Sequence, residues 1–287
     1  MQADTEIAYV NGDLLPLSEA RVSILDRGFQ FADGVYEVIP VYAGTPFRLE
    51  AHLARLERSL AEIGLALPMS REAFAANVEE VVRRNGGGDR QAYIQVTRGP
   101  APRNHPFPDE VRPTVVMTSG PIAPVPGEWL EAGVGAVTAP DIRWARCDIK
   151  SIALLPNVMM RQRATEEGAL EAIWIHGDQA VEGAASNLFA VSGGEALTPP
   201  DGPRVLPGIT RDVVLEVAAE QDLPVRTGPV AETDLRSADE LWLTSSTKEI
   251  LPVTRLDGEP VGSGRPGPLF RRTLEAYRAR IQAIREG

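Results

Sequence analysis

The chain has 287 residues, 43% of them hydrophobic and 24% charged, a composition typical of a globular protein long enough for two domains of moderate size. Its formal net charge of −11 disfavours nucleic acid and anionic membrane surfaces as partners, because their phosphates repel an acidic protein. A single cysteine excludes an internal disulfide, and no apolar stretch resembles a signal peptide or a membrane span, so we expect a cytoplasmic location.

Strand and helix patterns alternate in the first part of the chain. Asn11 and Gly12 form a pair that is typical of tight hairpin turns. Ser70 is a candidate N-cap, because its hydroxyl can accept a hydrogen bond from an N–H group of a first helical turn. The spacing of apolar residues predicts strands at 7–10, 36–42, 91–97 and 114–118 and helices at 49–63 and after residue 70.

A proline-rich stretch at 120–127 divides the chain. Beyond it, the patterns predict strands at 169–175, 186–191 and 240–243 and helices at 156–167, 209–221 and 267–284. The sequence therefore predicts a two-domain α/β (α+β) protein, with a small domain over 1–119, a linker over 120–127 and a larger domain over 128–287.

The residues that could bind a metal are widely separated in the sequence. His52, His105 and His176 show no spacing such as HExxH, and the single cysteine, Cys147, cannot form a CxxC pair. We therefore expect no metal site, and we interpret Cys147 as a small buried side chain.

Lysine is rare in this chain, because only Lys150 and Lys248 among its 29 basic side chains are lysines. An amine, unlike a guanidinium, can lose its proton and attack a carbonyl carbon to form a Schiff base. Lys150 lies in a mostly apolar stretch, residues 144–152, that could hold its amine out of water. Alternatively, Lys150 is a surface residue that has remained a lysine by chance. We expect Lys248 to be a surface residue near the entrance of the site.

Two further segments could bind an anion. Gly208 precedes a predicted helix, and the N–H groups of Ile209 and Thr210 would point out of its N-terminus, where phosphate binds well. An ordinary helix start explains the same residues. The hydroxyl cluster at 244–247 follows an apolar strand and can donate to phosphate or carboxylate, or form an ordinary turn.

Glu182 lies among small residues between two predicted strands. A buried glutamate needs a charged or hydrogen-bonding partner. A protonated pyridine nitrogen would satisfy it, and so would an arginine in a structural ion pair.

Several of these motifs together resemble a known family. The Glu-Gly-x-x-Ser-Asn motif at 182–187, the Asp-x-Lys-Ser context at 148–151 and the Leu-Pro-Gly-Ile-Thr-Arg run at 206–211 look like those of the class IV pyridoxal-phosphate aminotransferases. Residues 26–37 and 49–56 extend the resemblance over nearly the whole chain. It implies fold type IV, with a small N-terminal α/β domain and a larger C-terminal pseudo-barrel domain.

The resemblance implies that pyridoxal 5'-phosphate is the cofactor. Lys150 is then the catalytic residue, which forms a Schiff base with it. Glu182 is expected to pair with the pyridine nitrogen and keep it protonated. The phosphate is expected to contact Arg55, the N–H groups of Ile209 and Thr210, and the hydroxyl of Ser246. As an alternative, the Arg55 side chain could extend over the apolar core against which its helix packs, without binding a ligand.

The proline-rich segment 97–108 carries a second basic motif. Residues next to prolines favour extended conformations, in which side chains two positions apart project to the same side. Arg103 and His105 can therefore form a two-pronged donor pair for a carboxylate. The alternative is a solvated basic loop.

The Pro-Arg-Asn-His motif at 102–105 resembles the carboxylate-binding loop of D-amino-acid aminotransferases within the family. In those enzymes the arginine and histidine reach into the neighbouring subunit's site and join a tyrosine that matches Tyr36. Thr247 is a further expected contact of the substrate carboxylate. The resemblance therefore implies a homodimer with shared active sites.

We predict a transaminase that moves an amino group between a D-amino acid, of the D-alanine or D-glutamate type, and a 2-oxo acid by a ping-pong Schiff-base mechanism. The alternatives on the same fold are a branched-chain L-amino-acid aminotransferase, an (R)-amine transaminase and aminodeoxychorismate lyase; a non-catalytic pyridoxal-phosphate-binding module is an alternative of another class. Val181, Ala184 and Ala185 stand where D-amino-acid enzymes frequently carry residues with a hydroxyl group. We expect the loss of these hydroxyl groups to affect which substrate side chains the enzyme prefers.

Overall fold

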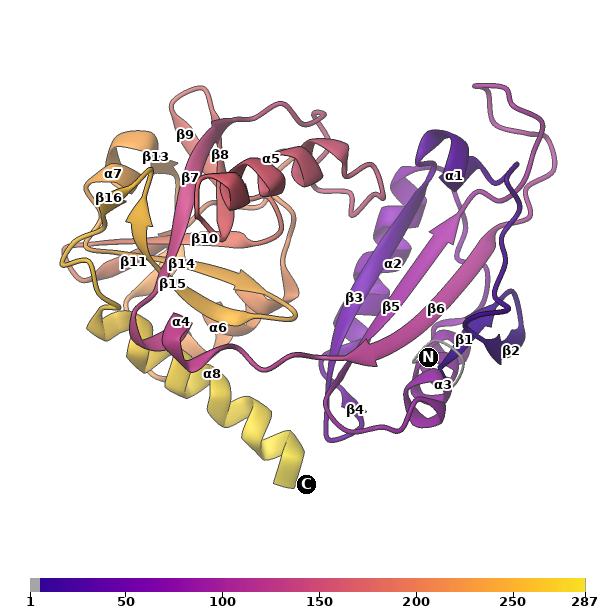
Figure 1. Ribbon diagram of the computed structural model, residues 1–287, viewed down its shortest axis with the longest axis horizontal. Helices are drawn as coiled ribbons and strands as arrows, with labels where there is room; N and C mark the ends of the chain where they lie inside the picture. Colours follow the sequence, from indigo (N-terminus) through magenta and orange to yellow (C-terminus); the bar gives the residue numbers. More distant parts are fainter. Residues whose placement is uncertain (1–5, 287) are drawn as a thin grey trace. The chain divides into compact units, whose positions relative to one another are not determined.

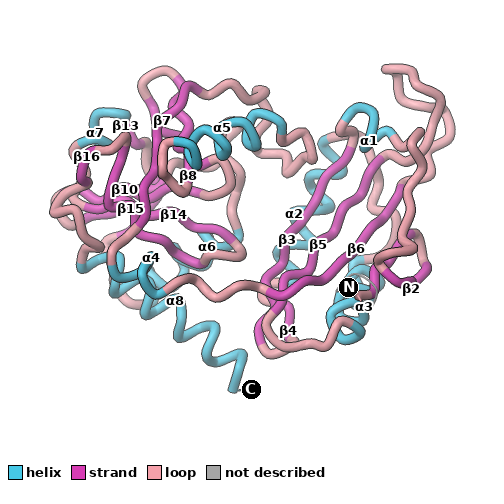
Figure 2. Tube along the Cα trace, viewed as in Figure 1, coloured by secondary structure: helices cyan, strands magenta, loops and turns pink. Residues whose placement is uncertain are grey.

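The computed structural model describes residues 6–286, which form two compact units (Figure 1). The first unit holds the described residues up to Ala123 together with Ile149–Ala153, and the second holds Pro124–Asp148 and Leu154–Glu286. Both units combine strands with helices (Figure 2), as the predicted α/β class requires. No helix within residues 6–286 is long and apolar enough to cross a membrane.

The first unit is built on a six-stranded antiparallel sheet in the order β2-β1-β6-β5-β3-β4. Its strands are β1 (Ile7–Val10), β2 (Asp13–Pro16), β3 (Gly34–Tyr42), β4 (Thr45–Pro46), β5 (Arg90–Thr97) and β6 (Thr114–Pro121). Its helices are α1 (Arg27–Phe31), α2 (Leu49–Glu62) and α3 (Arg71–Arg84).

Side-chain alternation along β3 sorts its residues between two faces of this sheet. Val35 and Ile39 are fully buried and pack with Leu53 and Leu56 of α2, so the apolar stripe predicted for this helix lies in the core. Tyr36 points to the opposite face and is only partly buried. One face of this sheet is therefore packed against α2, and the other carries Tyr36.

The predicted hairpin turn and helix cap of this unit are confirmed. Asn11 and Gly12 connect β1 to β2 with φ angles of 51° and 109°, values that asparagine and glycine adopt more readily than other residues. The hydroxyl of Ser70 accepts a hydrogen bond of 3.2 Å from the N–H group of Ala73.

The second unit contains a mixed ten-stranded sheet, in which β7 runs parallel to both β15 and β8. Its strands are β7 (Val134–Pro140), β8 (Glu171–His176), β9 (Gln179–Gly183), β10 (Asn187–Ser192), β11 (Glu195–Thr198), β12 (Val225–Thr227), β13 (Val230–Ala231), β14 (Glu240–Ser245), β15 (Glu249–Leu256) and β16 (Glu259–Pro260). Its helices are α4 (Gly127–Glu131), α5 (Leu155–Glu166), α6 (Ile209–Glu220), α7 (Glu232–Arg236) and α8 (Pro268–Glu286).

The C-terminal helix α8 is attached to this sheet through a buried carboxylate. Glu240 of β14 accepts hydrogen bonds from the N–H groups of Leu269 (3.0 Å) and Phe270 (2.8 Å) in the first turn of α8. The indole N–H of Trp242 donates to the same carboxylate at 3.0 Å, and its ring packs 6.4 Å from the ring of Phe270. The negative charge of Glu240 at the helix N-terminus and the packing of the two aromatic rings therefore both attach α8 to the sheet.

The predicted domain boundaries differ from the observed ones in two places. Strand β6 continues to Pro121, and the contact boundary falls between Ala123 and Pro124, inside the stretch expected to be a linker. Ile149–Ala153, which the sequence placed in the larger domain, joins the first unit instead. The reason is backbone pairing, because Ser151 forms an antiparallel bridge with β3, a long-range contact that apolar periodicity does not reveal.

The N-cap of α3 is expected to stabilise the protein measurably. Ser70→Ala should lower the free energy of unfolding by about 1 kcal/mol, because an N–H group of the first turn loses its acceptor. Urea unfolding measures this change. Ser70→Asp keeps an acceptor and should retain most of the stability; equal losses in both variants would contradict the capping role.

Candidate active site

Lys150 lies on the free edge of the first unit's sheet. Its carbonyl accepts a hydrogen bond of 3.0 Å from the N–H group of Tyr36, and its own N–H group donates to the hydroxyl of Ser59 at 3.3 Å. The amine Nζ lies 4.2 Å from the centroid of the Tyr36 ring. Lys150 is partly buried, and its amine lies against an aromatic face.

The aromatic face continues along the sheet from Tyr36. The rings of Tyr36 and Tyr93 are 5.9 Å apart, and the phenol of Tyr93 donates a hydrogen bond of 2.7 Å to Gln95. Burial, and to a smaller extent electrostatic repulsion from Tyr36, raises the pKa of Tyr93 to about 12, so the Tyr93 phenol keeps its proton at neutral pH. Tyr93 and Gln95 were not recognised in the sequence, although their alternation with buried residues of β5 places them on the face of Tyr36.

Arg55, expected to contact the phosphate, is held by a buried carboxylate. Its Nε and Nη2 atoms donate to the two oxygens of Glu37 at 2.7 Å each, and Nδ1 of His52 lies 2.7 Å from the same carboxylate. The side chains of Glu37, His52 and Arg55 are 0%, 1% and 4% exposed. This fork-to-fork geometry fixes the plane of the guanidinium.

The protonation states of this cluster follow from its contacts. Burial opposes the charge of Glu37, but Arg55 and His52 outweigh it and bring the pKa of Glu37 down to about 2. Burial lowers the pKa of His52, and the neutral ring then donates its Nδ1 proton to the carboxylate. Glu37 was not recognised in the sequence, although a carboxylate within the mostly apolar strand β3 indicates a buried charge that needs a partner.

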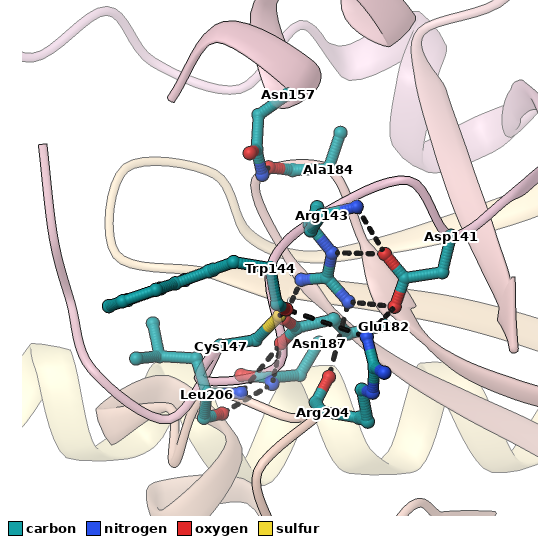
Figure 3. Close-up of polar contacts among 10 residues, drawn as sticks. All are labelled: Asp141, Arg143, Trp144, Cys147, Asn157, Glu182, Ala184, Asn187, Arg204 and Leu206. Carbon is teal, nitrogen blue, oxygen red and sulfur yellow. Dashed lines mark hydrogen bonds and ion pairs between the residues drawn. The ribbon is translucent and has the colours of Figure 1, made fainter. Parts of the chain in front are cut away.

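Glu182, expected to pair with a pyridine nitrogen, is 5% exposed on β9 of the second unit. Figure 3 shows the Arg143 guanidinium between Glu182 and Asp141. Arg143 Nη1 donates to Glu182 Oε1, while the N–H group of Leu206 donates to Oε2 at 2.9 Å and the Asn187 amide does so at 3.3 Å. Glu182 therefore has an arginine partner, one of the two partners that the sequence left open.

Arg143 and Asp141 were not recognised in the sequence. Nε and Nη2 of Arg143 donate to Asp141 at 2.9 and 3.1 Å, and the Asp141 side chain is fully buried. Burial opposes the guanidinium charge, but Asp141 and Glu182 outweigh it and raise the pKa of Arg143. Burial also raises the pKa of the nearby Cys147 thiol to about 11, so Cys147 stays protonated and is a buried side chain as expected.

The network around Glu182 continues to the N-terminus of α6. The Asn187 amide donates to the carbonyl of Leu206 at 2.8 Å, two residues before the N-cap Gly208. A Cβ atom on Gly208 would lie 1.8 Å from Asn187 Oδ1, so only glycine fits there. The N–H groups of Ile209 and Thr210 open a helix whose N-cap makes no side-chain hydrogen bond.

Ser246 and Thr247 lie in the turn between β14 and β15 and are both partly buried. Just before them, the Thr244 hydroxyl is buried and has no hydrogen-bond partner among the described residues. Lys248 follows in the same turn and is half-buried, not the surface residue expected. Burial and then Arg161 lower the pKa of Lys248.

Arg103 and His105 lie on an exposed loop of the first unit. Both contact Phe31 of α1: the Arg103 guanidinium is 5.1 Å from the centroid of its ring, and the His105 ring is 5.4 Å away. The structure thus places both side chains against one aromatic ring. Residues 6–286 contain no group of three or more side chains that could hold a metal ion.

The sequence profile of amino-transferase class IV matches residues 34–256. The chain belongs to the class IV aminotransferase family. The D-alanine aminotransferase of Bacillus licheniformis is 44% identical over 271 residues, which cover 94% of this chain and 95% of that protein. The D-alanine aminotransferase of Staphylococcus haemolyticus is 40% identical over 96% of this chain and 98% of its own length. The resemblance seen in the motifs is therefore confirmed.

Solved structures of class IV enzymes share the fold. The branched-chain amino acid aminotransferase of Escherichia coli superposes with a TM-score of 0.89 at 26% identity, over 96% of this chain and 94% of that one. The branched-chain aminotransferase of the archaeon Thermoproteus uzoniensis, solved with norvaline, gives 0.87 at 27% identity, over 97% and 95%. The predicted fold type is confirmed.

The buried Glu37 carboxylate gives a test of the site's electrostatics. Glu37→Gln should lower the free energy of unfolding at pH 7 by roughly 3–5 kcal/mol, because Arg55 and His52 lose a buried anionic partner. The native pKa of Glu37 is depressed from 4.5 to about 2, so its contribution is complete above pH 4.5 and is lost as pH falls toward 2.

Urea unfolding of both proteins at several pH values measures this effect. The difference between wild type and Glu37→Gln should shrink below pH 4.5. A difference that is constant across this range would contradict an ionised Glu37.

Proposed function

We propose that this class IV enzyme is a pyridoxal-phosphate-dependent transaminase that moves an amino group between a D-amino acid, of the D-alanine or D-glutamate type, and a 2-oxo acid. The observation that carries this proposal is the Arg103 and His105 pair, held on one aromatic ring in an exposed loop. The names of the sequence relatives support it, since D-alanine aminotransferases are 44% and 40% identical to this chain.

The residues present fit pyridoxal 5'-phosphate. When bound, this cofactor supplies an aldehyde that takes up the amino group and a ring that takes up electrons. The chain offers a half-buried lysine amine at Lys150 and a buried carboxylate at Glu182. It also offers a helix N-terminus behind Gly208 and an unsatisfied buried hydroxyl on Thr244, which are polar groups suited to a phosphate.

Lys150 is proposed to hold the cofactor covalently and, once released, to move the Cα proton of the substrate. One amine can serve in both directions because it is a base when neutral and an acid when protonated. The Tyr36 ring, whose centroid lies 4.2 Å from Nζ, helps to hold this amine in place.

Glu182 is proposed to bind the pyridine N–H. Arg143 and the N–H group of Leu206 hold its carboxylate in a fixed orientation, which prepares an anionic acceptor before the cofactor arrives. Arg55, Ser246 and the N–H groups of Ile209 and Thr210 are proposed to bind the phosphate. Glu37 would then act by orienting Arg55.

Arg103 and His105 are proposed to bind the substrate carboxylate in the site of a second copy of the chain, together with Tyr36 and Thr247 of that copy. The exposure of both side chains supports this arrangement. Apolar side chains that a homodimer could cover are also exposed, including Ile24 at 75% and Leu155 at 69%. A cytoplasmic location stays a prediction, consistent with the single free cysteine.

A branched-chain L-amino-acid aminotransferase is the second candidate, because solved branched-chain enzymes share the fold with TM-scores of 0.89 and 0.87. Their identities to this chain are 26% and 27%, well below those of the D-alanine enzymes. Spectral titration of the holoenzyme with D-alanine and then L-leucine decides between them. Conversion of the cofactor by L-leucine alone would overturn the proposal.

The role of Lys150 is tested by exchanging each lysine for arginine. Lys150→Arg should lower transamination by at least roughly 100-fold, because a guanidinium neither forms the Schiff base nor shuttles a proton. Borohydride reduction with pyridoxal 5'-phosphate should label the peptide that contains residue 150 in the wild type and in Lys248→Arg. Labelling retained in Lys150→Arg would contradict the assignment.

The carboxylate role of Arg103 is tested with two kinds of amino donor. Arg103→Met should raise KM for D-alanine by roughly 10- to 100-fold, because a charge-assisted hydrogen bond is lost. Turnover of (R)-1-phenylethylamine, which has no carboxylate, should change little. Equal losses for both donors would argue against a carboxylate-binding role.

A further inference from the structure

The short helix α1 is fixed firmly to the sheet of the first unit. Its N-cap, Asp26, is 2% exposed and accepts hydrogen bonds from the N–H group of Gly28 (2.7 Å) and the hydroxyl of Thr114 (2.6 Å). The N–H group of Arg27 donates to the carbonyl of Gly99 at 2.9 Å. A Cβ atom on Gly28 would lie 2.3 Å from the Thr97 side chain, so the helix has no room to shift.

Arg27 of α1 reaches across to the loop that carries the basic pair. Its guanidinium donates to the carbonyls of Asn104 (2.5 Å), His105 (3.1 Å) and Pro106 (3.4 Å), and its Nε donates to Asp33 at 2.7 Å. The Arg27 side chain is only 4% exposed. One buried guanidinium therefore binds three consecutive carbonyls of an otherwise exposed loop.

A second arginine holds the same loop one residue further on. Arg98 is 1% exposed, donates to Asp33 at 2.8 Å, and lies with its guanidinium 3.6 Å from the centroid of the Phe107 ring. Both arginines lower the pKa of Asp33 against the effect of burial, Arg98 the more strongly, so this carboxylate stays ionised. Asp33 is thus the common anchor of the loop.

Phe31, at the last turn of α1, meets the side chains of the loop. Its ring centroid lies 4.9 Å from the Arg27 guanidinium, 5.1 Å from the Arg103 guanidinium and 5.4 Å from the His105 ring. Arg103 and His105 are both exposed, so rotamer freedom would otherwise oppose their convergence on one ligand. The ring supplies a common surface that restricts both.

We propose that Phe31 is a positioning residue for substrate recognition: with Arg27 holding the loop backbone, its ring pre-arranges Arg103 and His105 for a carboxylate. The proposal rests on the carboxylate role given to this pair under Proposed function. Pre-arrangement favours binding because the ordering of two flexible side chains is completed before the ligand arrives. It makes Phe31 a determinant of preference for amino acids over amines that lack a carboxylate.

Phe31→Leu tests this proposal, because leucine keeps an apolar side chain and removes the ring. KM for D-alanine should rise about tenfold, the combined size of a cation–π and an aromatic contact, while kcat stays within about twofold. KM for (R)-1-phenylethylamine should not change. Phe31→Tyr restores a ring and should recover most of the D-alanine affinity.

A binding measurement separates recognition from turnover. Propionate carries a carboxylate and no amine, so its dissociation constant, obtained by spectral titration of the holoenzyme, reports the carboxylate site alone. It should rise about tenfold in Phe31→Leu. Phe29→Leu is the matched control, since Phe29 lies on the same helix and is 76% exposed, and the propionate affinity of this variant should equal that of the wild type.

The outcomes distinguish this inference from the proposed function. If Arg103→Met weakens propionate binding and Phe31→Leu does not, the positioning role of Phe31 is overturned and the carboxylate role of Arg103 stands. If Arg103→Met itself leaves propionate affinity unchanged, the carboxylate role fails first. Equal losses of D-alanine and amine turnover in Phe31→Leu would also overturn the inference, because they indicate general damage to the site.

Discussion

The arrangement of the first unit depends on a short stretch of backbone pairing at the free edge of β3. The N–H group of Tyr36 donates to the carbonyl of Lys150 at 3.0 Å, and the N–H group of Ile152 donates to the carbonyl of Gly34 at 3.1 Å. These bonds fix Lys150, the residue expected to react, relative to a rigid sheet. A rigid sheet positions a side chain more accurately than a mobile loop does. They also set the Lys150 amine against the Tyr36 ring.

Buried carboxylates that hold arginines recur in both units. Glu37 holds Arg55, Asp33 holds Arg27 and Arg98, and Asp141 together with Glu182 holds Arg143. A guanidinium suits this use because its planar fork meets both oxygens of a carboxylate and stays charged when buried. The lysine at position 150 differs from these arginines in use: arginine supplies fixed geometry, whereas the expected Schiff-base chemistry needs an amine.

Much of the fold could be predicted from the sequence, and the site residues that it predicts lie within described elements or turns. Sequence patterns predicted the features that residues close together in the chain determine, such as the Asn11-Gly12 turn and the Ser70 cap. They also predicted the helices α5, α6 and α8, whose ends lie within two residues of the prediction. Family motifs led to Lys150 and Glu182 as expected site residues. The sequence did not reveal Glu37, Asp33, Arg27 or Arg143, because each acts through partners far along the chain.

The sequence by itself determined the alternation of strands and helices, the family and the residues expected to do the chemistry. The reason is that periodicity, capping and motif spacing each involve residues that lie close together in the sequence. Only the tertiary structure decided that Ile149–Ala153 joins the first unit, that Glu182 is paired with Arg143, and that Arg103 and His105 share the ring of Phe31. These are contacts between residues distant in sequence. Such contacts depend on how whole elements pack, which no local pattern records.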